Sequence, residues 1–230
     1  MELQRALATR LAESVQELQA GPVPEIDATL NELTAVATDS VPGAQHAGIT
    51  VATRRGTVET VSSTHPLAVT LDDIQRRHCE GPCLSAAWDE QIIRIDDMAA
   101  DGRWPRYRRD ALAQTPIRSV LSFRLFLERK AMGALNFYAD SPHAFPEDAV
   151  AVGLLWASHT SLAWKMAERD QQYRAALQSR DIIGQAKGIV MERFGIGADQ
   201  AFDMLKQLSQ ESNTPLAAIA ERVVFSRGRS

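Results

Sequence analysis

Residues 146–194 restrict the possible folds of this chain most strongly, because no turn-forming segment interrupts their helical pattern. Mostly apolar residues recur there at alternating spacings of three and four, the pattern of a helix that packs along a partner helix. The seam comprises Val152, Leu155, His159, Leu162, Met166, Arg169, Tyr173, Ala176, Arg180 and Ile183. Because two arginines interrupt it, we expect any coiled coil to be short. A chain of 230 residues should then form two unequal parts connected by this helix.

The first 21 residues predict a separate amphipathic helix. Its apolar residues lie close to one helical face, and Gly21-Pro22 ends the pattern. These residues are Leu3, Leu7, Leu11, Val15 and Leu18. We expect this helix to pack beside the long one, which would give a four-helix bundle in a homodimer.

Between these helices the periodicity becomes that of strands. After a helix at about residues 24–38, the pattern predicts one hairpin at residues 48–61 and another at residues 119–138. Helical segments and a short strand, residues 92–95, lie between the two hairpins. This order indicates an α+β domain, with one antiparallel sheet flanked by helices.

This order of elements resembles a GAF domain over about residues 24–164, and we place the domain at residues 22–165. The matching stretches are Gly81-Pro82-Cys83-Leu84, Ile95-Asp96-Asp97-Met98, Gly133-Ala134-Leu135-Asn136-Phe137-Tyr138 and Phe145-Pro146-Glu147-Asp148. The resemblance implies a sensor domain that responds to a small molecule or a protein. No signature of cyclic-nucleotide, haem or bilin binding is visible, so we expect no cofactor, and no metal spacing is completed.

Residues 166–230 should form the end of the long helix and an all-α unit of three helices. Two short helices are predicted at residues 198–211 and 215–224. On the long helix one face is free, and it carries Arg180, Gly184, Lys187, Gly188 and Met191. The opposite side is apolar and should pack, with Ile182, Ile183, Ala186, Ile189 and Val190. Each glycine costs on the order of 1 kcal/mol in helix propensity, which indicates that another group must approach closely.

The same unit is similar to the ANTAR family in its whole length. The similarity is carried by residues 177–194, then Ala201-Phe202-Asp203-Met204-Leu205 and Ile219-Ala220. It implies binding to paired RNA hairpins with short loops, which prevents a transcription terminator from forming. Carried over onto this sequence, the RNA-binding residues are Arg180, Gln185, Ala186, Lys187 and Gly188, with Met191, Ser209 and Asn213 as weaker additions. Basic residues would meet phosphates and small residues would admit unstacked bases. We expect Phe202 to be a core residue instead.

Charge and cysteine content limit the class of protein. The net charge is -4. From Gln171 onward, however, the chain has eight Lys and Arg and six Asp and Glu, a balance of +2. We therefore expect any polyanion to bind to this part. Two cysteines make no disulfide framework. The N-terminus carries an acid where a signal peptide has basic residues, and no apolar run reaches a membrane-spanning length. We therefore expect a cytoplasmic protein without a membrane partner.

Two regulatory alternatives stay open. The short helices around residues 212–214 look like a helix-turn-helix that would bind DNA, although residues 215–220 are almost wholly apolar and belong in a core. The chain would also fit a protein-interaction module in which the C-terminal part serves only to dimerise.

An enzyme is the least favoured class, and we expect none. Cys79 and Cys83 form a Cys-x3-Cys pair that we interpret as structural thiols, the alternatives being a thiol redox sensor or a GAF-fold methionine sulfoxide reductase. We interpret Asp72-Asp73 and Asp96-Asp97 as caps or turns, because the strands do not alternate with helices as a receiver domain requires.

Overall fold

The computed structural model of the chain describes residues 26–53, 57–88, 90–125 and 131–225. The chain divides into two compact units, one ending at Glu168 and the other beginning at Arg169. The predicted helix over residues 1–21 lies outside the described residues.

The first unit is built on a five-stranded antiparallel sheet with the order β2-β1-β5-β4-β3. The strands are β1 (His46–Thr53), β2 (Val58–Ser63), β3 (Ile92–Ile95), β4 (Ser119–Leu125) and β5 (Ala131–Ala139). Both predicted hairpins are confirmed, since β1 pairs with β2 and β4 pairs with β5. β5 also pairs with β1, which joins the hairpins into one sheet.

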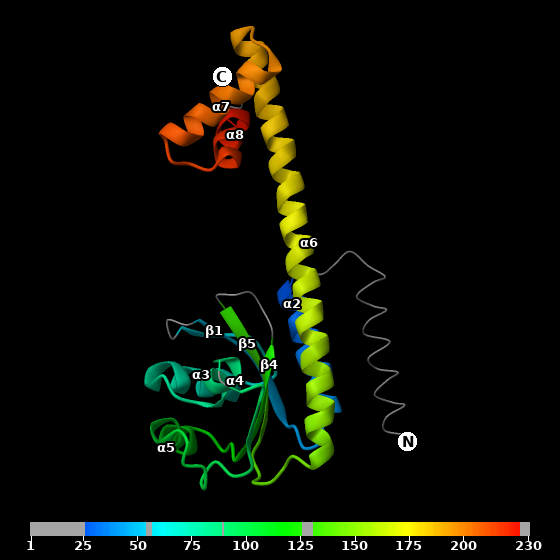
Figure 1. Cartoon of the computed structure of the whole chain (residues 1–230), viewed down its shortest axis with the longest axis vertical. Helices are drawn as coiled ribbons and strands as arrows, with labels where there is room; N and C mark the ends of the chain where they lie inside the picture. Colours follow the sequence, from blue (N-terminus) through cyan, green and yellow to red (C-terminus); the bar gives the residue numbers. More distant parts are fainter. Residues whose placement is uncertain (1–25, 54–56, 89, 126–130, 226–230) are drawn as a thin grey trace. The chain divides into compact units, whose positions relative to one another are not determined.

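Helices cover both faces of this sheet (Figure 1). One face carries α2 (Ile26–Ser40) and the first part of α6 (Glu147–Phe194), and the other carries α3 (Pro66–His78), α4 (Pro82–Trp88) and α5 (Pro105–Gln114). The central strand β5 therefore has a core on each side, with Leu135 and Phe137 in one and Ala134 and Tyr138 in the other. This is the alternation that the sequence predicts.

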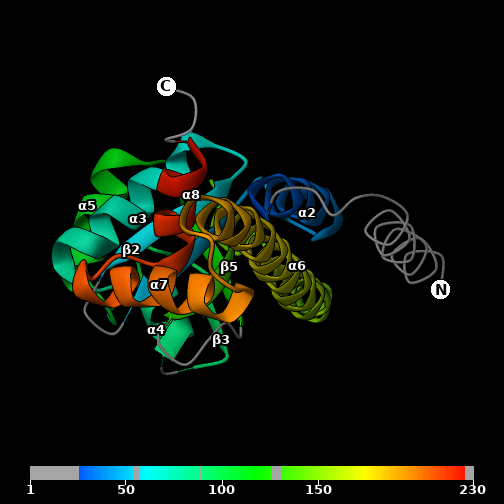
Figure 2. The ribbon, with the colours of Figure 1, turned by 90° about the horizontal axis from the view of Figure 1, so that it is seen from above.

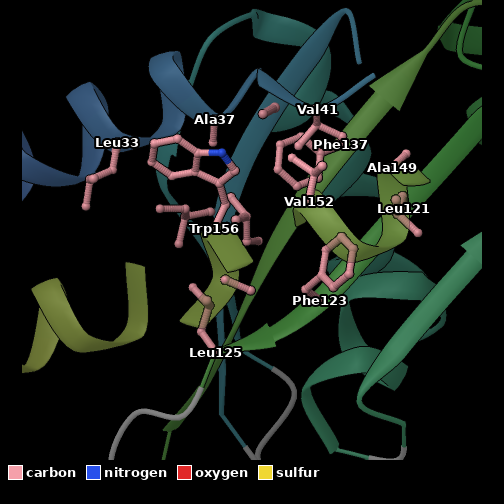
Figure 3. Packing of buried hydrophobic residues seen from close by; sticks show 14 of the residues in the cluster. Leu33, Ala37, Val41, Leu121, Phe123, Leu125, Phe137, Ala149, Val152 and Trp156 are labelled. Atoms are coloured by element: carbon pink, nitrogen blue, oxygen red, sulfur yellow. The ribbon is translucent and has the colours of Figure 1, made fainter. Parts of the chain in front are cut away.

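The core between α2, α6 and the sheet centres on Trp156, whose side chain is fully buried. Figure 3 shows its indole next to Leu33 and Ala37 of α2. One turn earlier, Gly153 permits a close approach of α6 to the sheet, because an added Cβ would lie 2.3 Å from the ring of Phe123. α6 can therefore approach the sheet this closely only because residue 153 has no side chain.

The second unit consists of the end of α6 with α7 (Ala198–Glu211) and α8 (Leu216–Phe225), which lie against it (Figure 2). Gly195, with a φ of +64°, ends α6 in the left-handed conformation. The core is small and rich in alanine, which lets the helices approach closely. Its buried members are Ala186, Val190, Ala201, Leu205, Ile219 and Ala220. The predicted all-α unit of three helices is confirmed.

Candidate nucleic-acid interface and buried polar cluster

The end of α6 has one side in the core and one side in solvent. Ala186 and Val190 are buried against α7 and α8, whereas Arg180, Gln185 and Gly188 are exposed. Because a helix turns by about 100° per residue, the exposed positions fall on the side away from the core. Most of the predicted site residues therefore share an accessible surface, here called the α6 face and defined by Arg180, Gly184, Gln185, Lys187 and Gly188.

Lys187 and Met191 lie at the border between the α6 face and the core. Both are partly buried, and Met191 packs against the core cluster. A lysine in this position can lay its aliphatic stem along the apolar border while its ammonium group stays in solvent. Met191 instead contributes mainly to packing.

The two glycines of the α6 face leave its backbone bare. A Cβ added at Gly184 or at Gly188 would meet no atom of the described residues within 4 Å, apart from the neighbouring backbone of the helix. The close approach that the sequence predicts is therefore not made by the described part of this chain. What these glycines provide is a stretch of helix that a bulky external group can approach.

The positive charges of the α6 face have no acidic partner within the described residues. Among the described residues, neither Arg180 nor Lys187 takes part in an ion pair or a side-chain hydrogen bond, whereas Arg174 on the same helix pairs with Asp170 at 2.6 Å. Unpaired cations on a solvent-facing helix are suited to contact phosphate oxygens.

One predicted site residue is corrected by the structure. Ala186 is fully buried in the core of the second unit, so its side chain is not available to RNA. The physical reason is packing, because the close contact between α6 and the other two helices needs a small side chain at this position.

Ser209, in the last turn of α7, and Asn213, in the α7–α8 connection, have structural roles in the fold. The Ser209 hydroxyl donates a hydrogen bond to the carbonyl oxygen of Thr214 at 2.6 Å. Asn213 has a φ of +48°, a left-handed conformation that asparagine tolerates better than most residues. Both residues shape the turn, and neither belongs to the α6 face.

The prediction that Phe202 is a core residue is wrong. Its side chain is 39% exposed, while the neighbouring Ala201 and Leu205 fill the core. Phe202 follows Ala201 by one residue, and this rotation carries it to the flank of α7.

A buried polar cluster lies between the sheet and α3 in the first unit, and it was missed by the sequence analysis. The Asp72 carboxylate accepts hydrogen bonds from the hydroxyls of Thr50 at 2.8 Å and Thr60 at 2.6 Å, and from the Gln75 amide at 3.0 Å. Asn136 in turn donates to the Thr50 hydroxyl at 2.9 Å. Asp72 lies in the middle of α3, so its interpretation as a cap or turn is wrong. The available signal was a polar residue on the same side of the predicted helix as the apolar residues Ala68, Leu71 and Ile74.

The electrostatics of this cluster are unusual because Asp72 has no cationic partner among the residues bonded to it. Burial is the largest effect and raises the pKa of Asp72 to about 6, although its four neighbouring donors oppose the shift. The hydroxyl of Tyr107 and the amide oxygen of Asn136 are also buried, and neither has a hydrogen-bond partner within the described residues. The first unit thus holds buried polar groups that its own side chains only partly satisfy.

The two cysteines occupy different environments. Cys79 is exposed and caps α3 with a φ of +53°, while Cys83 is buried with its sulfur 3.9 Å from the Tyr138 hydroxyl. Burial, and secondarily the negative charge of Asp72, raises the pKa of the Cys83 thiol. Since the thiolate is the nucleophile, this environment is unfavourable for thiol chemistry at Cys83.

The arginine-rich helix α5 is fixed to the end of α3 by polar contacts. The Glu80 carboxylate accepts from the Arg106 side chain at 2.6 Å and from its backbone N–H at 3.1 Å. His78 contacts the Asp110 carboxylate at 2.7 Å. Arg106 and Asp110 thus connect α5 to the end of α3.

No three His, Cys, Asp or Glu side chains of the described residues are grouped so that they could hold a metal ion. None of the described helices combines the length and the apolar character that a membrane span needs.

Family models match both parts of the chain. A model described as GAF domain matches residues 24–165, and a model described as ANTAR domain matches residues 171–224. No curated relative matches the chain.

Solved structures resemble the first unit. The GAF domain of a phosphoenolpyruvate-protein phosphotransferase from Coxiella burnetii is 15% identical, with a TM-score of 0.54, and the match covers 72% of this chain and 96% of that one. The corresponding domain from Acinetobacter is 18% identical, with a TM-score of 0.53 and coverages of 74% and 96%. A free methionine-R-sulfoxide reductase from Neisseria meningitidis is 13% identical, with a TM-score of 0.50 and coverages of 69% and 88%. At these identities the similarity shows the fold alone.

Proposed function

Because this chain belongs to the GAF domain family and carries a C-terminal ANTAR domain, we propose that it is an RNA-binding regulator of transcription. In this proposal the ANTAR domain binds paired RNA hairpins in a nascent transcript and antagonises a terminator, and the GAF domain controls this activity. Its role would be regulatory and not catalytic.

The observation that carries the proposal is the α6 face. It presents Arg180 and Lys187, which form no ion pair within the described residues, next to the bare backbone of Gly184 and Gly188, and no described atom covers these glycines. Sequence-specific RNA binding relies on unstacked bases that need room, together with cations for phosphates. The α6 face offers both.

DNA binding is less well supported by the same unit. α8 would be the recognition helix of a helix-turn-helix, but Ile219 and Ala220 are buried in the core. Its remaining positions offer few polar side chains for base edges. For protein binding alone, the uncovered glycines of α6 have no evident use.

The proposal is tested by RNA binding of the full chain with Lys187→Ala and Lys206→Ala. Both variants remove one positive charge, but Lys206 lies on α7, outside the α6 face. The probe is a synthetic RNA of two tandem hairpins, compared with duplex DNA of equal charge by fluorescence anisotropy at several salt concentrations. We expect Lys187→Ala to weaken RNA binding about tenfold or more, and Lys206→Ala to change it only slightly, because a placed contact is worth roughly 1–3 kcal/mol.

A glycine variant separates steric approach from helix stability. Gly188→Leu should stabilise α6 by roughly 1 kcal/mol, because the site is open and leucine favours the helix. It should nevertheless lower the RNA affinity, since the side chain covers the bare backbone. Equal effects of the two lysine variants, or equal and steeply salt-dependent binding of RNA and DNA, would contradict the proposal.

We also propose that the chain is a homodimer through α6. Exposed apolar residues recur on this helix at spacings of seven and four, and they are Leu155, Leu162, Met166, Tyr173 and Leu177. Such a stripe fits a second copy of the same helix. In a parallel pair, Lys165 of one copy would lie near Asp170 of the other, five residues further along the helix. Opposite charges would then flank the stripe. The predicted contribution of residues 1–21 lies outside the described residues.

The dimer is tested by molar mass from light scattering. Leu162→Glu combined with Met166→Glu should give a monomer, because four buried carboxylates would meet in the seam. Gln171→Glu, on the opposite side of α6, should leave the dimer intact. A wild-type chain that is monomeric at tens of micromolar would exclude this interface.

A further inference from the structure

The last turn of α6 presents an aromatic side chain to solvent. Phe194 is 55% exposed, and it belongs neither to the core of the second unit nor to the partly buried residues packed against that core. Its ring contacts no other aromatic ring of the described residues. A Cβ added at the next residue, Gly195, would also stand in open space. A single exposed apolar residue is common, so the meaning of Phe194 depends on what lies beside it.

Phe194 continues the line of cations on the α6 face. It follows Lys187 by seven residues, and Lys187 follows Arg180 by seven. On an α-helix seven residues correspond to a rotation of only about 20° and a rise of about 10 Å. Arg180, Lys187 and Phe194 therefore lie nearly in line, and neither cation forms an ion pair within the described residues. An aromatic ring thus stands at the end of a row of available positive charges.

The surroundings of Phe194 favour RNA over a second copy of the chain. The apolar stripe proposed for the dimer ends at Leu177, and no large apolar side chain of α6 is exposed between Leu177 and Phe194. The exposed positions between them carry charged or polar side chains or glycine. A second α6 in a parallel pair that reached Phe194 would bring Arg180 and Lys187 next to their own copies, where like charges repel.

We propose that Phe194 stacks on an unpaired base of the same hairpin loop whose phosphates contact Lys187 and Arg180. This inference rests on the proposed RNA-binding function and adds a base-contacting residue to it. Aromatic rings bind unstacked bases of RNA loops, since every base has a π-face. The rise of about 10 Å between Lys187 and Phe194 places the two side chains at neighbouring nucleotides of one loop. The uncovered Gly188 leaves room for the strand beside them.

The first test measures the affinity of the full chain for the tandem-hairpin RNA. Phe194→Ala should weaken binding roughly tenfold, as expected for the loss of one stacked base. Phe194→Trp should keep the affinity because indole also stacks, whereas Phe194→Leu should lose it because leucine is apolar but has no π-face. Leu208→Ala is the matched control, since it removes an apolar side chain of similar exposure, 49%, from α7 and should leave the affinity unchanged.

An abasic nucleotide tests the partner of the ring directly. If the loop bases of the RNA are removed one at a time, wild type should bind one of these RNAs roughly tenfold more weakly. Phe194→Ala should bind that abasic RNA as well as it binds the intact RNA, because the stacked pair is already lost. Additive losses at every loop position would mean that the ring contacts no loop base, and they would overturn the inference.

The outcomes separate this inference from the proposed function. If Lys187→Ala weakens RNA binding and Phe194→Ala does not, stacking is excluded while the proposed function stands. If Phe194→Leu binds RNA like wild type, Phe194 contributes only apolar contact area and the inference fails. If Phe194→Ala changes the molar mass but not the RNA affinity, Phe194 is a protein contact and the inference fails. If wild type does not bind the RNA at all, the proposed function fails and this inference fails with it.

Discussion

Leu205→Ala is expected to lower the free energy of unfolding of the C-terminal unit by about 2–5 kcal/mol. Leu205 is 2% exposed and is one of only six buried residues in this core, three of which are alanines. A unit of this size has a free energy of unfolding of only about 3–9 kcal/mol. Most of the stability of α7 and α8 would therefore be lost, together with the support of the α6 face.

Two spectroscopic signals can follow this change separately. All four tryptophans precede Arg169, so tryptophan fluorescence reports the first unit, whereas circular dichroism at 222 nm reports all helices. Leu205→Ala should shift part of the dichroism transition to lower temperature and leave the fluorescence transition in place. Leu208→Ala is the matched control, because this leucine is 49% exposed. Similar shifts for both leucines would refute the description of this core.

Asp72 is expected to make the stability of the first unit depend on pH. Its pKa rises from the ordinary value of 3.8 to about 6 on folding, so the folded state binds the proton more tightly than the unfolded state. The stabilising contribution of the protonated carboxyl is complete below about pH 4 and is lost as the pH rises through 6. A shift of this size corresponds to about 3 kcal/mol, in order of magnitude.

Asp72→Asn removes this dependence, since the amide stays neutral. The stability of the variant relative to wild type, from urea unfolding followed by tryptophan fluorescence, should increase between pH 4 and 7 by up to about 3 kcal/mol. Comparison with wild type cancels the contributions of the other carboxyls. Asp73→Asn is the control, because Asp73 is exposed and pairs with Arg76 only at the surface, where ion pairs contribute little. A difference between Asp72→Asn and wild type that stays constant over this pH range would exclude a buried, ionisable Asp72.

The helices, the strands and both families could be predicted from the order of the residues alone. Regular spacing of apolar residues predicts α6 and both hairpins, because the periods of a helix and a strand are local properties of the backbone. The GAF and ANTAR resemblances depend on short stretches of consecutive residues, and the family models confirm them.

Which side chains are buried depends in part on packing between elements, which the sequence analysis could not predict. Phe202 lies on a helix that the sequence predicts, but α7 packs with Ala201 and Leu205 in the core, which leaves Phe202 39% exposed. Asp72 is buried because residues from β1 and β2, 22 and 12 positions away, enclose it. Burial and hydrogen bonding depend on neighbours distant in the chain, and helical periodicity gives the direction of a side chain without saying what lies there.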